Sequence, residues 1–161
     1  MASNTFSADV NHDGTMTEIR FAGRLDELAS GTLEAALGEM RTRVRINFRE
    51  VTRISSYGIG LLMRCLGNAS SGREIEFTEC SEVVVDQFQM LDFSRYGRIT
   101  SFYARYYCSR CDKQDEVLLV IARDLAIDRA SSAVQAPEFA CSCGGTSTVD
   151  DSLEFVIDHL D

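Results

Sequence analysis

The chain lacks the sequence features of membrane-spanning, secreted and nucleotide-binding proteins. Its 161 residues include one lysine, one proline and two histidines. No apolar run approaches the roughly 20 residues that a membrane-spanning helix needs. The first residues carry neither the basic flank nor the apolar segment of a secretory signal, so we expect a soluble, cytoplasmic protein. The single lysine, Lys113, follows no glycine-rich loop, which excludes a phosphate-binding loop of the Walker type.

Acidic residues outnumber basic ones, and the excess is uneven along the chain. The formal net charge is −9. Residues 1–107 hold 12 basic and 14 acidic groups, whereas residues 108–161 hold 4 and 11. Because an acidic surface repels phosphate backbones, unassisted binding of nucleic acid loses most of its electrostatic driving force. We therefore expect a protein partner, and nucleic acid is the less favoured alternative.

Hydrophobic periodicity predicts an α/β domain over residues 1–107. The order of elements is β-β-α-β-α-β-α-β, which is typical of a mixed sheet covered by helices. A turn over residues 11–14 separates the first two strands, which predicts a hairpin, and residues 23–26 are expected to form a loop. The predicted strands are 6–10, 15–21, 43–49, 74–77 and 99–107, and the predicted helices start near Ser30 as N-cap, after residue 56 and at Ser81.

Three segments have residues that are also found, in the same order, in a known regulatory family. Residues 21–26 (FAGRLD) are similar to a Gly-x-Leu-Asp turn, and residues 51–62 (VTRISSYGIGLL) to an Asp-Ser-Ser-Gly-x-Gly helix start. Residues 77–81 precede an apolar helix that ends at residues 91–93. Together these segments resemble the STAS family of anti-sigma-factor antagonists over residues 6–107. The resemblance implies a STAS-like fold and a non-enzymatic role in signal transduction and transcription regulation, with a kinase or anti-sigma factor as partner.

The resemblance also implies a phosphorylation site at Ser56, which aligns with the family's phosphorylated serine through Gly58. A serine at a helix N-terminus lies beside free N–H groups, and a phosphate adds about −1.5 to −2 charges, enough to reverse binding to an acidic partner. This chain differs from the family at Ser55, where an aspartate is usual, and at Tyr57, where a small serine is usual. Two alternatives stay open: Ser55 and Ser56 only cap the helix, and Asp26 stabilises a turn instead of contacting a partner.

Four of the six cysteines form two tight pairs near the C-terminus. Cys108 and Cys111 form a C-x2-C motif, and Cys141 and Cys143 form C-x-C-G-G. Two such turns complete a tetrahedral site of four sulfurs, the coordination that structural zinc prefers. Strand patterns at 102–107, 116–121, 139–140 and 153–157 flank the pairs and predict a zinc-ribbon-like β element over residues 108–161, with 123–134 as an inserted helix or loop.

Other interpretations of the cysteines are a redox dithiol, an iron–sulfur cluster and unligated thiols. A redox pair usually opens a helix, whereas strands flank both pairs here. Cys65 and Cys80 stand alone in apolar stretches, which is typical of buried, inert thiols. The cysteine segment follows the fifth strand directly, so the last helix of the STAS family is expected to be absent. We expect the segment to pack on the α/β domain or to offer a surface to another protein.

No set of residues forms a catalytic constellation, and we predict that the chain is not an enzyme. His12 in a turn and His159 near the C-terminus are interpreted as surface residues. Asp150 and Asp151 are interpreted as a solvated loop. The arginines at positions 43, 45 and 49 share one strand face, which is either solvated or docks an acidic partner.

The sequence thus predicts a regulatory protein-binding module with a structural zinc site. Binding would use Asp26 and the helix start from Ser55 to residue 60, with or without phosphorylation at Ser56. Two other functions stay open. In one, the chain is a constitutive scaffold subunit with Tyr57 as a buried interface anchor. In the other, the zinc ribbon contacts nucleic acid or the transcription machinery.

Overall fold

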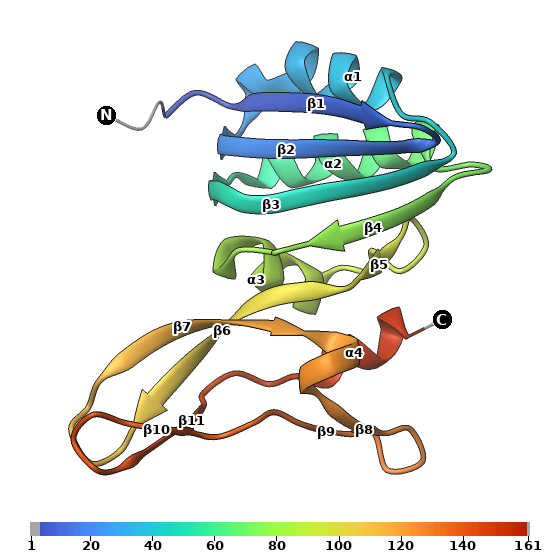
Figure 1. The fold of residues 1–161 in the computed structure, drawn as a ribbon. Helices are drawn as coiled ribbons and strands as arrows, with labels where there is room; N and C mark the ends of the chain where they lie inside the picture. The colour runs from blue at the N-terminus through green and yellow to red at the C-terminus, as the bar shows by residue number, and fades with distance from the viewer. Residues whose placement is uncertain (1–3, 161) are drawn as a thin grey trace.

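Five strands form the first sheet, in the order β1-β2-β3-β4-β5, in the computed structural model, which describes residues 4–160 (Figure 1). β1 and β2 pair antiparallel as the predicted hairpin, and each later neighbour pairs parallel. This is the mixed sheet that the sequence predicts. The strands are β1 (Ser7–Asp13), β2 (Met16–Leu25), β3 (Arg43–Ile54), β4 (Glu74–Thr78) and β5 (Arg98–Ile99).

Helices cover one face of this sheet (Figure 1). The cause is visible in β3, where Val44, Ile46 and Phe48 are buried beneath the helices while Arg43 and Arg45 point to solvent. The α/β fold class is therefore confirmed. The helices are α1 (Ser30–Gly38), α2 (Ser56–Ala69), α3 (Glu82–Met90) and the short 3-10 helix η1 (Glu27–Ala29).

Two local predictions in the first sheet are wrong. Residues 23–26 do not form a loop, because β2 continues to Leu25 with a register shift after Gly23. A Cβ on Gly23 would lie 2.3 Å from the backbone oxygen of Thr5, so glycine lets the strand pass this segment. Ser30 is not an N-cap: Ala29 occupies that position, and Asp26 caps η1 instead.

The second sheet is antiparallel, with the strand order β10-β11-β6-β7. The predicted strand 99–107 is split at Thr100. The part before Thr100 is β5, which pairs with β4, and the part after it is β6, which pairs with β7 in the second sheet. The chain thus continues into β6 instead of a further long helix, as the sequence predicts. The strands are β6 (Ser101–Cys108), β7 (Gln114–Val120), β10 (Phe139–Ala140) and β11 (Thr146–Val149).

Two predictions in the C-terminal third are also wrong. Residues 153–157 do not form a strand: Leu153 is the N-cap of the 3-10 helix η2 (Glu154–His159), and the strand lies earlier, at β11. The inserted segment 123–134 is mostly a hairpin, whose turn is closed by the Asp128 carboxylate accepting from the N–H of Ala130. The remaining elements are α4 (Ile121–Asp124), β8 (Ala126–Asp128) and β9 (Ala133–Gln135).

One hydrophobic core continues from the first sheet to the C-terminal segment. The rings of Phe102 on β6 and Phe155 on η2 lie 5.3 Å apart, and Val156 is fully buried. The C-terminal segment thus packs on the α/β part. The division into domains 1–107 and 108–161 stays a prediction. Within residues 4–160, no helix is long and apolar enough to cross a membrane.

Candidate metal centre and Ser56 surface

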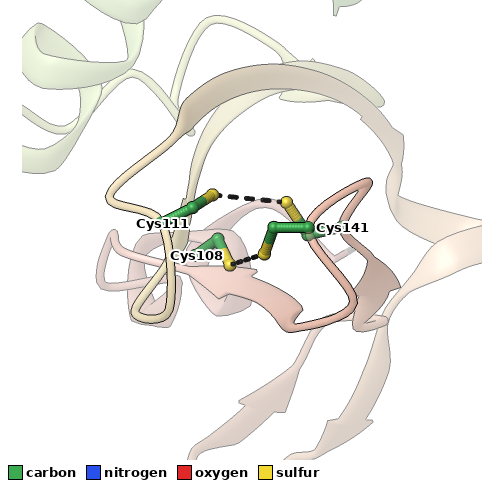
Figure 2. Close-up of side chains that lie close together, drawn as sticks. Cys108, Cys111 and Cys141 are labelled. Carbon is green, nitrogen blue, oxygen red and sulfur yellow. Dashed lines mark hydrogen bonds between the residues drawn. The ribbon is translucent and has the colours of Figure 1, made fainter.

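Two turns of the second sheet bring the four paired cysteines together (Figure 2). Cys108 ends β6 and Cys111 lies in the turn to β7, while Cys141 and Cys143 lie in the turn between β10 and β11. Because β11 pairs with β6 in the register Ser147↔Cys108, the two turns face each other. The sequence-predicted set of four is therefore adjacent in space.

The sulfur positions have the dimensions of a metal site. Cys108 Sγ lies 3.6 Å from Cys143 Sγ, and Cys111 Sγ lies 3.6 Å from Cys141 Sγ. All four sulfurs lie within 4.8 Å of one another. A disulfide would need about 2.05 Å, whereas a tetrahedron with metal–sulfur bonds of about 2.3 Å has edges of about 3.8 Å. The donor set can therefore hold a metal ion.

Small residues after the second pair let the backbone approach the sulfurs. The N–H of Gly145 donates to Cys143 Sγ at 3.3 Å. A Cβ on Gly145 would lie 3.0 Å from Cys108 Sγ and 2.9 Å from Arg110 Cβ, so only glycine fits between the two turns. Gly144 has a φ of +87°, which favours glycine as well. The C-x-C-G-G sequence is thus explained by the close contact of the turns.

Backbone N–H groups and neighbouring thiols give Cys141 and Cys143 different pKa values. The N–H of Cys143 lowers the pKa of Cys141 to about 6, because it stabilises the thiolate. The N–H of Gly145 lowers the pKa of Cys143, but burial and the three neighbouring thiols raise it to about 12. Cys141 is therefore the more readily ionised thiol of the second pair.

The two remaining cysteines lie in the core, as the sequence predicts. Cys80 is completely buried, and Cys65 packs on the inner side of α2. Burial raises the pKa of both thiols. Neutral buried thiols are poor nucleophiles.

The other predicted site residues meet at the carboxyl ends of β2 and β3. The N–H of Ser55 donates to the backbone oxygen of Leu25 at 3.0 Å, which joins the turn before η1 to the start of α2. Gly58 packs on the same oxygen, and a Cβ there would lie 1.9 Å from it. The second motif therefore needs glycine at this position for close contact with β2.

Of the two serines at the start of α2, only Ser55 caps the helix. Ser55 is the N-cap of α2, and its hydroxyl accepts from the N–H of Gly58 at 3.0 Å. Ser56 is the first helical residue and is exposed, and its hydroxyl has no hydrogen bond within residues 4–160. Asp26 caps η1 by accepting from the N–H of Leu28 at 3.0 Å, the turn-stabilising role that the sequence leaves open.

Large apolar side chains are exposed in the same two turns. Tyr57 is 57% exposed and Leu28 is 80% exposed. Sequence reasoning missed Leu28, because an apolar residue beside a cap is usually interpreted as part of the core. A shallow cavity lined by Arg24 and Arg53 lies beside them. The Ser56 surface is defined here as Asp26, Leu28, Ser55, Ser56 and Tyr57.

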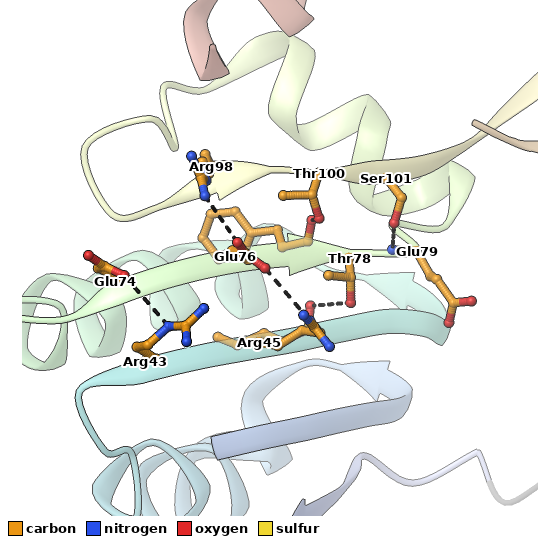
Figure 3. A network of polar contacts seen from close by, with 11 residues as sticks. Arg43, Arg45, Glu74, Glu76, Thr78, Glu79, Arg98, Thr100 and Ser101 are labelled. Atoms are coloured by element: carbon orange, nitrogen blue, oxygen red, sulfur yellow. Dashed lines mark hydrogen bonds and ion pairs between the residues drawn. The ribbon is translucent and has the colours of Figure 1, made fainter. Parts of the chain in front are cut away.

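The strand arginines pair with carboxylates across the open face of the sheet (Figure 3). In the parallel register, Arg43 lies 3.8 Å from Glu74, and Arg45 lies 3.7 Å from Glu76. Arg49 lies over the ring of Tyr103. These contacts favour a solvated, self-paired sheet face over a docking site for an acidic partner.

The structure corrects two further interpretations. His159 is buried, and its Nδ1 accepts from the N–H of Ile99 at 3.3 Å. Burial lowers the pKa of His159. Asp151 does not belong to a solvated loop: its carboxylate is 12% exposed and pairs with Arg105 at 2.6 Å. His12 is exposed, as predicted, but it lies on β1 and not in a turn.

The chain is similar to known proteins at the level of solved structures. No family model matches the chain, and no curated protein matches it. The chain is similar to a solved structure described as the anti-sigma factor antagonist SpoIIAA in its unphosphorylated form. The identity is 24%, the TM-score is 0.44, and the match covers 58% of this chain and 87% of that chain.

Proposed function

We propose that this chain is a cytoplasmic, non-enzymatic regulatory module whose Ser56 surface binds a protein partner. The observation that carries the proposal is the exposure of two large apolar side chains, Tyr57 and Leu28, beside the exposed Ser56. Exposed aromatic side chains serve as interface anchors. The motif resemblance to the STAS family supports a kinase or anti-sigma factor as the class of partner.

Phosphorylation of Ser56 would switch this binding. Three features support the switch: Ser55 already caps α2, the Ser56 hydroxyl is accessible, and the helix N-terminus favours negative charge. A phosphate there adds about −1.5 to −2 charges next to Tyr57 and therefore opposes an acidic partner. A kinase must accommodate Tyr57, because that ring follows the hydroxyl directly.

The four-cysteine cluster would hold a structural zinc ion. A site closed by four thiolates offers no open coordination position, so the metal stabilises the two turns and supplies no catalysis. Zinc is favoured over an iron–sulfur cluster by the pairing of two short turns on antiparallel strands, and over a redox dithiol because both pairs lie in turns between strands.

The experiment that tests the proposal is native mass spectrometry of the full chain purified from its own host. We expect one zinc ion, and a phosphate that maps to Ser56 and is absent from Ser56→Ala. Partner capture from the same host should be weakened by Ser56→Asp and by Tyr57→Ala. Arg64→Gln, an exposed change about two helical turns along α2 from Tyr57, is the matched control and should leave capture unchanged.

The outcomes separate the alternatives. Zinc without phosphate in every growth condition, with capture that still depends on Tyr57, would support a constitutive subunit instead. Binding of the chain to nucleic acid that weakens as the salt concentration rises would support the alternative in which the zinc ribbon contacts nucleic acid. Capture that neither Ser56→Asp nor Tyr57→Ala alters would contradict the proposal.

A further inference from the structure

A cluster of arginines lies at the ends of the first-sheet strands that are opposite to the Ser56 surface. Ser56 follows the carboxyl end of β3, whereas this cluster surrounds the amino ends of β3, β4 and β5. A cavity of about 580 Å³ opens there. Ligand sites commonly measure roughly 300–1,000 Å³. The arginines that line it are Arg43, Arg73, Arg95 and Arg98.

Positive charge exceeds negative charge in this cavity. Arg43 lies 3.8 Å from Glu74, and Arg98 lies 3.1 Å from Glu76. Asp158 is the third carboxylate in the lining. The other two arginines, at positions 73 and 95, form no ion pair within residues 4–160. Asp92 acts on Arg95 only through space, without a direct ion pair. On a chain of net charge −9, a lining with four arginines and three carboxylates favours an anionic ligand.

Both of these arginines are exposed, and hydrogen bonds to the backbone hold Arg73 in place. The Nε of Arg73 donates to the backbone oxygen of Met40 at 3.3 Å, and its Nη1 donates to that of Ala69 at 2.6 Å. These two contacts leave its Nη2 available. Arg95 lies 5.9 Å from the ring centroid of Tyr96. Ordering before binding reduces the entropy cost of capturing an anion.

The C-terminal segment forms one wall of the cavity. Asp158 and His159 on η2 line it, and His159 is fixed by the N–H of Ile99 on β5. Met16 and Tyr96 supply apolar surface to the same space. The lining thus combines guanidinium groups with apolar side chains, which suits a ligand that has both an anionic group and an uncharged part.

We propose that this cavity binds a small organic phosphate. Two guanidinium groups match the charge and the oxygen geometry of a phosphate dianion better than those of a single carboxylate. Arg73 and Arg95 would hold the phosphate, and the organic part would lie against Tyr96 and Met16. The site is separate from the Ser56 surface and does not depend on the function proposed for that surface.

The test is calorimetric titration of the full chain, at low chloride concentration, with phenyl phosphate and with inorganic phosphate. We expect saturable binding at one site per chain, with phenyl phosphate binding more tightly. Arg95→Gln should weaken binding at least ten-fold, whereas Arg64→Gln should leave it unchanged. Arg95 is chosen because Arg73 also holds two backbone oxygens, so its loss would disturb the fold.

Backbone amide shifts locate the site. We expect phenyl phosphate to move the resonances of residues 94–98. Shifts confined to Ser55 and Gly58 would assign the anion to the start of α2 and overturn the proposal. Equal weakening by both arginine variants, or no saturable binding, would overturn it as well. Inorganic phosphate binding as tightly as phenyl phosphate would refute the organic part of the ligand.

Discussion

Two glycines of α2 lie two residues apart and have opposite surroundings. Gly58 lies against the backbone oxygen of Leu25, whereas nothing lies within 4 Å of a Cβ built on Gly60. The Gly-x-Gly spacing therefore contains one glycine needed for close approach and one that a helix tolerates. This distinction yields a prediction at the residue scale.

Gly58→Ala should lower the free energy of unfolding by about 2–4 kcal/mol, because the added methyl group overlaps a backbone oxygen that cannot move alone. Gly60→Ala should raise it by about 0.5–1 kcal/mol, since alanine is the better helix former. Urea denaturation of both variants checks this. Equal effects of the two substitutions would contradict the contact with β2.

His159 gives the fold a pH dependence. Burial lowers its pKa in the folded state, against the opposing effects of Asp158 and Asp92. Above a pH of about 6.5 the ring is neutral in both states. As the pH falls through this value, the unfolded state binds a proton that the folded state resists, so stability is lost.

We therefore expect the free energy of unfolding to decrease between pH 8 and pH 5.5, and the decrease to be smaller in His159→Gln. Glutamine removes the titration and keeps a side-chain acceptor for the N–H of Ile99. Urea denaturation at the two pH values measures the difference. An unchanged slope in the variant would show that other groups cause the pH dependence.

At the scale of elements, two ion pairs of Arg105 attach the C-terminal segment to α3. Arg105 on β6 pairs with Glu82 of α3 at 2.8 Å and with Asp151 at 2.6 Å. The Asp151 carboxylate also accepts from the N–H of Arg105 at 2.9 Å. Because Asp151 lies just before η2, this contact orients the helix that carries Phe155 into the core.

Asp151→Asn should cost about 1–2 kcal/mol, because a charge-assisted contact with Arg105 is replaced by a neutral one. Asp150→Asn is the matched control: this neighbouring carboxylate is exposed, so the change should stay within about 0.5 kcal/mol. Thermal unfolding of both variants measures the contrast. A similar loss in the control would point to net charge instead.

At the scale of the whole molecule, the proposed metal site and the first sheet share β6. Cys108 ends this strand, and its first residues contact the end of β4, where the N–H of Glu79 donates to the Ser101 hydroxyl at 2.8 Å. Metal loss should therefore loosen the second sheet first, because the cysteine turns are exposed and carry little apolar core.

We expect a chelator to speed amide exchange in β7 and β11 by at least ten-fold while β2 and β3 stay protected. Hydrogen exchange with and without added zinc measures this. Cys111→Ser should reproduce the effect of the chelator, whereas Cys65→Ser, which leaves the cluster intact, should keep the wild-type response to zinc and chelator. Uniform loss of protection would indicate that the two sheets unfold as one unit.

The sequence by itself determined the elements of the first sheet and the set of four cysteines. Strict alternation in β3 and the i, i+3, i+4 stripes of the helices specify which side is buried, since each pattern has one compatible geometry. The C-x2-C and C-x-C-G-G motifs carried enough local information to name the four cysteines that lie together, because short turns place both sulfurs of a pair on one side.

Only the tertiary structure decided the rest. Residues 153–157 are apolar at four of five positions, like a short buried strand. Most of them form η2 instead, where Phe155 packs on Phe102 of β6 and Val156 is fully buried, contacts that no local pattern reveals. His159 and Asp151 look like surface residues until that packing buries them. The exposure of Leu28 and the arginine cavity likewise depend on which strands are neighbours in the sheet. Contacts between distant segments of the chain determine that order.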